Sequence, residues 1–182
     1  MKLMIISDIH GSAYYCQLAM QAFEKEKPDK VLILGDVLYH GPRNDLPKDY
    51  DPKKVVAMLN EKKDYIVGIT GNCDADIDAV VLEYPISEDL IFFIGDRTVY
   101  ASHGHRKNET NVPPHRKGDI LLNGHTHVPA CIEHDDYLYI NPGSTSIPKQ
   151  DSCHSYMMVN DGLLEWKDLE DGRIYMSKDL SK

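Results

Sequence analysis

The chain has 182 residues, 42% hydrophobic and 27% charged, with a formal net charge of −9. This length and composition predict one globular domain, residues 1–182, that can bury a substantial core. No apolar stretch is long enough to cross a bilayer, and no run of Lys and Arg offers the clustered charge that long nucleic acids require. We therefore expect neither a membrane nor a long nucleic acid as a partner.

Cysteine usage indicates the compartment. The four cysteines are scattered and form no CxxC pair, which favours reduced thiols over a disulfide framework and predicts a cytoplasmic protein. The apolar run at the N-terminus is too short for a signal peptide and is typical of a first strand. The cysteines are Cys16, Cys73, Cys131 and Cys153.

The first half of the chain alternates strand and helix patterns. Ser12 is placed to cap a helix whose apolar positions 16, 19, 20 and 23 share one face. A second helix is predicted from Asp51-Pro52, where an acidic cap precedes proline at the first helical position. Strands are expected over residues 2–7, 30–34 and 65–70, and a short helix over about residues 74–81.

The second half is rich in strands joined by tight turns. The strongest hairpin signal is Asp161-Gly162, between apolar residues 155–160 and 163–167. The halves together predict two sheets packed face to face, with helices on the outside. Further strands are expected over residues 90–94, 97–102, 130–134, 137–141 and 172–176.

Five short clusters of metal-ligating residue types follow apolar runs, at the points where strands should end. Because βα-type sheets deliver functional groups at the carboxyl ends of their strands, we expect the clusters to meet at one edge of one sheet. Carboxylate and imidazole ligands suit divalent Mn, Fe, Ni, Co and Zn, so the pattern predicts a metalloenzyme. The clusters are Asp8-Ile9-His10, Gly35-Asp36, Gly71-Asn72-Cys73-Asp74, His103-Gly104-His105 and Gly124-His125-Thr126-His127.

In this order, the motifs D-x-H, G-D, G-N-x-D, H-G-H and G-H-T-H resemble the calcineurin-like metallophosphoesterase superfamily. The surrounding sequence is similar to its YfcE-like phosphodiesterase branch, and the resemblance covers nearly the whole chain. It implies an α/β fold: a four-layer α/β/β/α sandwich of two mixed β-sheets flanked by helices. The segments that carry the similarity to the branch include Ser7–Gly11, His40–Asn44 and Asn141–Ser144.

The resemblance also implies an activity and a ligand set. The expected enzyme is a metal-dependent phosphoric diester hydrolase that attacks a small phosphodiester with a metal-bridging hydroxide. Its cofactors would be two divalent ions, Mn before Fe, Ni, Co or Zn, and a homo-oligomer is suggested by the resemblance alone. Asp8, His10 and His127 would bind the first ion and Asn72, His103 and His125 the second, with Asp36 bridging both and Asn72, Cys73, His103 and His105 forming the catalytic set.

Two long loops leave proposed ligand strands, and we expect both to cover the substrate. One runs from Val37 to Tyr50 and the other from Gly104 to Gly118. Arg43 and Asn44 in the first loop are the candidates for binding phosphate oxygens, since the Arg fork matches phosphate geometry. The alternative is that both loops are solvated surface and Arg43 an ordinary exposed residue.

Position 73 departs from many relatives, which have histidine there to protonate the leaving oxygen. A thiol is a poorer acid than imidazole at neutral pH. His105 stands beside a ligand and is expected to contact the metal or the phosphate. His40, His115, His134 and His154 are expected to have no metal role.

Two other classes of protein remain as alternatives. One is a protein-binding scaffold that keeps the phosphoesterase fold with little catalysis, and the complete ligand set argues against it. The other is a structural metal domain. Closed coordination is typical of such domains, and a mixed Asp/His/Asn set with a bridging acid does not suggest it.

Overall fold

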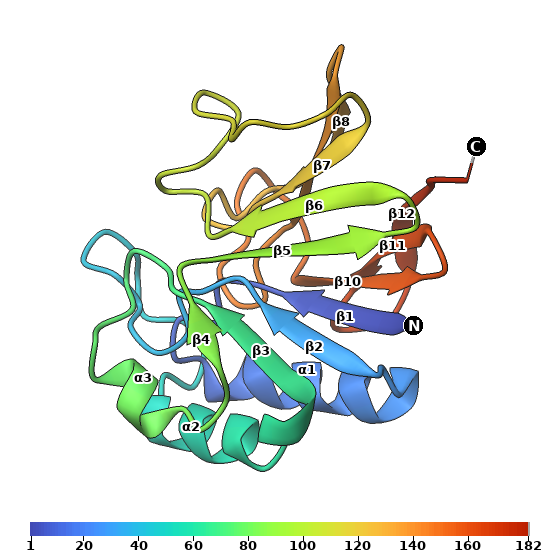
Figure 1. The fold of residues 1–182 in the computed structure, drawn as a ribbon. Coiled ribbons are helices and arrows are strands. Elements are labelled where there is room, and N and C mark those ends of the chain that lie inside the picture. Colours follow the sequence, from blue (N-terminus) through green and yellow to red (C-terminus); the bar gives the residue numbers. More distant parts are fainter. Residues whose placement is uncertain (182) are drawn as a thin grey trace.

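Two mixed β-sheets packed face to face, with helices on one side, form the computed structural model, which describes residues 1–181 (Figure 1). In the seven-stranded sheet, ordered β12-β11-β10-β1-β2-β3-β4, strands β1 to β4 are parallel and β10 to β12 antiparallel. Its strands are β1 Lys2–Ile6, β2 Lys30–Ile33, β3 Ile66–Ile69, β4 Ile86–Ser87, β10 Ser155–Asn160, β11 Leu163–Asp168 and β12 Ile174–Asp179.

The five-stranded sheet has the order β5-β6-β7-β9-β8. Strands β6, β7 and β9 are parallel to one another, and the edge strands β5 and β8 are antiparallel to their neighbours. Both sheets are therefore mixed, which confirms the α/β class and the two-sheet arrangement. The strands are β5 Asp89–Ile94, β6 Arg97–Ser102, β7 Asp119–Leu122, β8 Pro129–Glu133 and β9 Tyr137–Pro142.

The two predicted helix caps are confirmed. Helix α1 spans Ala13–Glu26, and the Ser12 hydroxyl accepts from the backbone N–H of Tyr15 (3.3 Å). Helix α2 spans Pro52–Asn60 and is capped by Asp51, which accepts from the backbone N–H of Lys54 (3.1 Å). A 3₁₀ turn η1, Lys63–Tyr65, leads into β3, and α3 is one turn, Asp78–Val81.

The helix expected over about residues 74–81 therefore begins late. The Asp74 carboxylate accepts from the backbone N–H of Gly71 (2.7 Å), and this bond closes a turn where the helix was expected to begin. Strand β4 has only two residues, and no alternation in the sequence predicts a strand that short. The last strand starts at Ile174 because Gly172 lies at φ 76° in the preceding turn.

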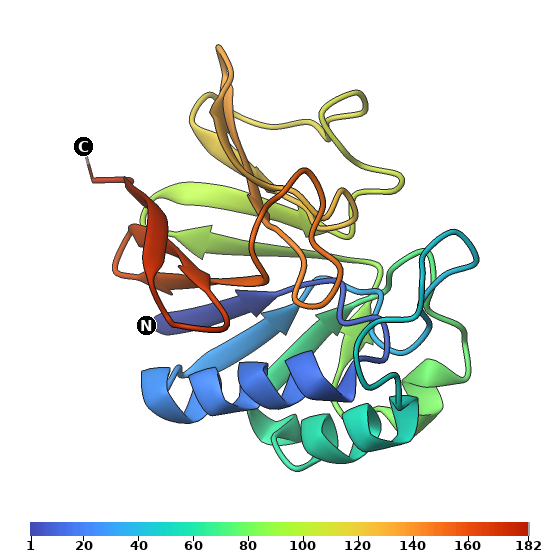
Figure 2. The ribbon, with the colours of Figure 1, turned by 180° about the vertical axis from the view of Figure 1, so that it is seen from behind.

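All helices of the described chain lie on the outer face of the seven-stranded sheet (Figure 2). The fold class is as expected, but the helix layer predicted on the other outer face is not found within residues 1–181. No helix follows α3, and a loop over residues 104–118 lies on that face of the five-stranded sheet instead. His134 Nε2 lies 2.8 Å from Glu109 Oε1 and His115 Nε2 lies 3.1 Å from Asp136 Oδ2, so these pairs fasten the loop to the β8–β9 hairpin. No helix within residues 1–181 is long and apolar enough to span a bilayer.

Strand β1 is buried on both faces, as its continuous apolar run predicts. Met4 and Ile6 pack against α1 and α2, while Leu3 and Ile5 pack between the two sheets. A buried Leu or Ile side chain contributes about 1.5–3 kcal/mol, so the central strands are held firmly from both sides. That rigid base carries the loops that leave their carboxyl ends.

Candidate metal centre

The five motif clusters meet where parallel strands of both sheets end. Backbone hydrogen bonds extend the pairing past the strands: the N–H of His10 donates to Asp36 O (2.9 Å), and that of Gly124 to His103 O (2.9 Å). The N–H of His125 donates to Asp8 Oδ2 (3.1 Å), which joins a loop of one sheet to a loop of the other. The predicted convergence is confirmed, but the prediction of a single sheet was wrong: three clusters follow β1, β2 and β3 of the seven-stranded sheet and two follow β6 and β7 of the five-stranded sheet.

Five of the ten non-glycine residues with positive φ in the described chain are expected ligands. An L-residue in the left-handed region costs roughly 1 kcal/mol, so a cluster of such residues needs support from its surroundings. Strained backbone of this kind gathers at functional sites, where it aims side chains. The residues are Asp8 (57°), His10 (49°), Asp36 (54°), His125 (65°) and His127 (62°).

Two motif glycines are required by close approach. A Cβ at Gly71 would lie 2.1 Å from Asp36 Oδ1, and one at Gly124 would lie 2.0 Å from Ser7 Oγ. No other residue fits without displacing the loops that carry the ligands.

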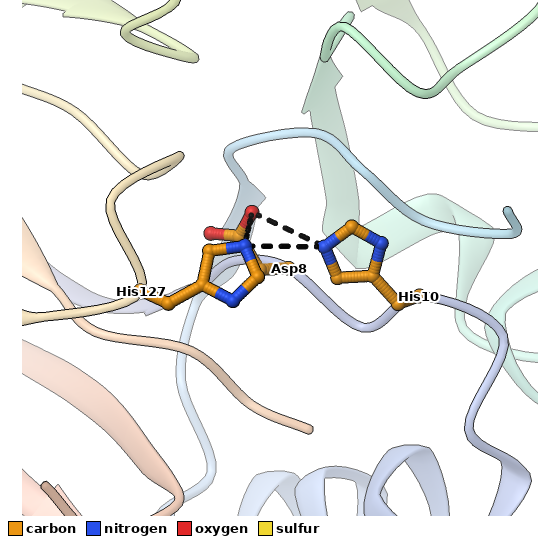
Figure 3. A group of neighbouring side chains, drawn as sticks. All are labelled: Asp8, His10 and His127. Atoms are coloured by element: carbon orange, nitrogen blue, oxygen red, sulfur yellow. Dashed lines mark hydrogen bonds and ion pairs between the residues drawn. The ribbon is translucent and has the colours of Figure 1, made fainter. Parts of the chain in front are cut away.

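Asp8, His10 and His127 form the first group of ligand atoms, and their side chains point toward one another (Figure 3). Asp8 Oδ1 lies 3.3 Å from His127 Nε2 and 3.6 Å from His10 Nε2, and the two Nε2 atoms are 3.3 Å apart. Two donors about 2.1 Å from one ion lie roughly 3.0–3.4 Å apart, so these spacings suit a shared cation. Asp8 Oδ1 is buried and accepts no hydrogen bond in the described chain, which fits the same interpretation.

The histidine rings are oriented by main-chain carbonyls. Nδ1 of His10 donates to Tyr39 O (2.7 Å), Nδ1 of His127 to Ile147 O (2.7 Å), and Nδ1 of His103 to Leu34 O (2.6 Å). Because each Nδ1 carries the proton, each neutral ring presents the lone pair of Nε2 to the site.

Asp36, His103 and His125 form a second group, with Asn72 beside it. His103 Nε2 lies 3.4 Å from Asp36 Oδ2 and 3.1 Å from Asn72 Oδ1. Asp36 Oδ2 is also 3.6 Å from His10 Nε2, so this one oxygen faces both groups. Carboxylate, imidazole and amide donors in these positions fit two divalent cations.

The charges of the site are strongly coupled. Burial would raise the pKa of Asp8, but His10 and His127 outweigh it and hold that pKa well below its usual range. Burial would likewise raise the pKa of Asp36, and His103 reverses the direction. Burial opposes the charged form of His103, yet Asp36 and Asp8 raise its pKa to about 9. Burial and the neighbouring His103 lower the pKa of His125.

A cavity of about 650 Å³ opens beside these groups. Arg43 and Asn44, the candidates for binding phosphate, line it, and the Asn44 amide also donates to His40 O (2.8 Å) and so braces its own loop. Lys149 lines the cavity too and is missing from the expected site, since an exposed Lys far along the chain gives no sequence signal. Its position follows from its backbone N–H, which donates to His127 O (3.1 Å).

The expectation that both long loops cover the substrate is corrected for the second loop. No residue of 104–118 lines the cavity. Lys107, Pro113 and Pro114 instead lie over Tyr100 and Leu121 on the outer face of the five-stranded sheet. The loop turns away because its two histidine–carboxylate pairs hold it to the β8–β9 hairpin.

His105 and Cys73 lie at the edges of the site. The ring centroid of His105 is 5.5 Å from that of His103, and its buried Nδ1 has no partner among the described residues. The Cys73 backbone N–H donates to Asp36 Oδ1 (2.8 Å). Burial and the Asp36 charge raise the pKa of the Cys73 thiol to about 12, so it is protonated at neutral pH.

The end of β9 and the segment after it support the loops that carry the first group. The hydroxyls of Ser144 and Ser146 both donate to Asp8 O (3.0 Å each). The Asn141 amide donates to Gly124 O (2.7 Å), beside the two histidines of the last cluster.

Comparisons with known proteins agree with this geometry. Residues 1–161 match the model of the calcineurin-like phosphoesterase superfamily domain. The phosphodiesterase YfcE of Escherichia coli (strain K12) is 38% identical over 175 residues, which cover 96% of this chain and 95% of YfcE. The structure of the E. coli phosphoesterase Yfce superposes with a TM-score of 0.95 at 37% identity, covering 99% of this chain and 100% of that one.

A more distant structure shares only the fold. Vacuolar protein sorting 29 of Cryptosporidium parvum is 21% identical, with a TM-score of 0.62 over 97% of this chain and 96% of its own. The family match and the YfcE relationship confirm the resemblance that the motifs carry. This chain belongs to the calcineurin-like phosphoesterase superfamily.

Proposed function

We propose that this protein is a metal-dependent phosphodiesterase that hydrolyses a small phosphodiester at a site for two divalent ions. The observation that carries the proposal is the position of Asp36. Its Oδ2 atom lies 3.6 Å from His10 Nε2 in the first group and 3.4 Å from His103 Nε2 in the second. One carboxylate oxygen shared by two ligand groups is the arrangement a dinuclear site needs.

Two sets of residues would hold the ions. When bound, the ions would supply a water acidified for attack and positive charge for the oxygens of the phosphorus centre. Nitrogen and oxygen donors without thiolate ligands favour Mn, with Fe, Ni, Co or Zn as substitutes. The first set is Asp8, His10 and His127, the second is Asn72, His103 and His125, and Asp36 belongs to both.

The cavity wall would orient the substrate. Arg43 has no hydrogen-bond or ion-pair partner among the described residues, so its guanidinium is available to a phosphate oxygen. Asn44 holds the loop that presents Arg43, through its bond to His40 O. Lys149 adds a second positive charge to the wall.

Proton delivery to the leaving oxygen would be weak. The Cys73 thiol, with its pKa raised to about 12, is a poor general acid at neutral pH. Burial and the charge of His103 lower the pKa of His105, which makes that ring a poor donor in its place. Substrates whose leaving oxygen is stable as an anion would therefore react fastest.

The ligand geometry supports catalysis over the scaffold alternative. A scaffold has no need for an unpaired buried carboxylate oxygen on Asp8, nor for three imidazoles aimed by backbone carbonyls. Asp8, His10 and His127 also lie at positive φ, and cation binding explains both the unpaired oxygen and the strained backbone.

The test measures hydrolysis of an aryl phosphodiester and of the matching monoester by chelated and metal-restored protein. We expect no turnover after chelation, recovery with Mn, and preference for the diester. Elemental analysis should find two ions per chain. If the protein contains no stoichiometric metal and shows no turnover after Mn is restored, the alternative of a protein-binding scaffold would replace this proposal.

A further inference from the structure

Asp74 closes the G-N-x-D motif, and its carboxylate collects three backbone N–H groups. Oδ2 accepts from Gly71 (2.7 Å) and from Asp36 (2.8 Å), and Oδ1 accepts from Val37 (2.7 Å). Charge-assisted bonds to backbone amides at these lengths are among the stronger hydrogen bonds in proteins. The side chain is thus fully committed to the main chain and is not among the ligand groups of the site.

The three bonds join two loops that follow different strands. Asp36 and Val37 follow β2, whereas Gly71 and Asp74 follow β3. The two loops touch through their backbones, because a Cβ on Gly35 would lie 2.5 Å from the backbone N of Gly71. The Asp74 carboxylate therefore links the two loops at a point where their backbones pack directly against each other.

Each loop in this joint carries a ligand candidate. The Cys73 N–H holds Asp36 Oδ1 at 2.8 Å, which turns Oδ2 toward His10 and His103. On the same turn, Asn72 Oδ1 lies 3.1 Å from His103 Nε2. A shift of the β3 loop relative to the β2 loop would move Asn72 and the Asp36 carboxylate together.

We propose that Asp74 is a positioning residue that sets the distance between Asp36 and Asn72, and thereby determines affinity at the second metal position. The inference rests on the proposed function of the site as a two-ion centre. Groups that orient ligands typically affect metal affinity by about 10–100-fold.

The test variant is Asp74→Asn. Its single amide oxygen can accept only some of the three backbone hydrogen bonds. Its NH₂ group would face at least one backbone N–H, and two donors cannot bond to each other. We expect the first Mn to bind nearly as in the wild type and the second about 10–100-fold more weakly.

Asp119→Asn is the matched control. Asp119 is also a buried carboxylate that accepts from backbone amides, those of Thr98 (3.1 Å) and Arg116 (2.7 Å), at the amino end of β7. Both variants should melt at lower temperature than the wild type, because both leave backbone donors unmatched. Only Asp74→Asn should lose affinity for the second ion.

Two readouts other than activity decide the matter: calorimetric titration of the metal-free protein with Mn, and the electron paramagnetic resonance spectrum of the loaded protein. The wild type should show two ions and a spin-coupled pair, and Asp74→Asn should show mainly isolated Mn. Two ions of wild-type affinity and a coupled spectrum in Asp74→Asn would overturn the inference alone. Failure of the wild type to bind two ions would overturn the proposed function as well.

Should Asp74→Asn fail to fold, the same titration applies to Asp74→Glu. This variant keeps both acceptor oxygens but adds a methylene, which no longer fits three bonds of 2.7–2.8 Å. A several-fold weaker second site supports the proposal, and an unchanged second site overturns it.

Discussion

The metal centre holds buried carboxylates and the last turn of α1 holds a partly buried one, but the two regions neutralise the negative charge in different ways. Glu26 accepts from Lys167 Nζ (2.8 Å), Lys2 Nζ (3.0 Å) and the Tyr156 hydroxyl (3.2 Å), so its partners lie within the fold. Asp8 and Asp36 form ion pairs only with histidines in the described chain.

The difference in partners distinguishes a structural ion-pair cluster at Glu26 from a binding site at Asp8 and Asp36. Burial would raise the pKa of Glu26, but Lys167 and Lys2 outweigh it and lower that pKa, so the pair is complete without a ligand. In the metal centre it is histidines that lower the Asp pKa values, and a divalent cation would take over that role. A buried carboxylate that has no Lys or Arg partner within the fold, and that a bound metal ion would neutralise, indicates a ligand site.

The largest effect that would sharpen this contrast is expected from Asp36→Ala. Loss of the oxygen shared by both groups should lower kcat/KM for an aryl phosphodiester by roughly 10³-fold or more, because both ions lose a ligand. Glu26→Gln is the control and should keep wild-type kcat/KM. Retained activity in folded Asp36→Ala would break the distinction between the two regions.

A smaller effect is expected from Cys73→His. General acid catalysis contributes about 10²–10⁴-fold where it operates, so the variant should gain most on substrates with basic leaving groups. A leaving-group series should give a steep fall in rate with leaving-group pKa for the native protein and a shallower fall for Cys73→His. Equal slopes, with metal content intact in both, would assign leaving-group protonation to another residue.

Metal affinity should depend on pH around neutrality, whereas the ion pairs of Glu26 should weaken only in acid. The pKa of His103 in the metal-free protein is raised to about 9, and only its neutral ring can bind an ion. Affinity should therefore rise about tenfold per pH unit from pH 7 and level off near pH 9. Calorimetry in buffers of different ionisation enthalpy should detect one proton released from this ring at pH 7, and a pH-independent affinity would contradict the assignment.

Arg43→Ala tests the cavity wall without touching either ligand group. We expect kcat/KM to fall about tenfold, as for the loss of one charge-assisted phosphate contact of about 1.5 kcal/mol, with metal content unchanged. Lys149→Ala serves as the comparison, because Lys149 contributes the other positive charge of the cavity wall from a distant part of the sequence. Unchanged kinetics in Arg43→Ala across several diesters would support the alternative that Arg43 is an ordinary exposed residue of a surface loop.

The smallest effect concerns stability at Glu26. Glu26→Gln should lower the free energy of unfolding by about 1 kcal/mol at neutral pH, since partial exposure weakens its ion pairs. Because the folded pKa of Glu26 lies below its unfolded value, this stabilisation is present above the unfolded pKa and disappears as pH falls through the folded one. Chemical denaturation at several pH values should show wild type and variant converging in acid.

Much of the fold and site could be predicted because the evidence is local. Ser12, Asp51 and the Asp161-Gly162 turn use neighbouring backbone groups, so their residue types indicate their geometry. The ligand clusters directly follow strand patterns, and strand direction then decides where they meet.

What could not be predicted depends on distant partners. Lys149 reaches the cavity through the N–H···O bond to His127, which no periodicity encodes. The loop over residues 104–118 turns away because His115 and His134 find Asp136 and Glu109, each an ordinary surface residue type. The role of Asp74 is similarly hidden, because its three bonds go to backbone.

The main-chain anchoring of the ligands separates two kinds of mutational change. Tyr39 uses its carbonyl to hold His10 and is also one of the residues that line the cavity. Lys149 likewise uses its N–H toward His127 and offers its side chain to the cavity. Substitutions at these two positions can therefore change which diester fits while leaving the ligand geometry intact, so substrate preference can drift through generations of sequence change on a constant metal-binding frame.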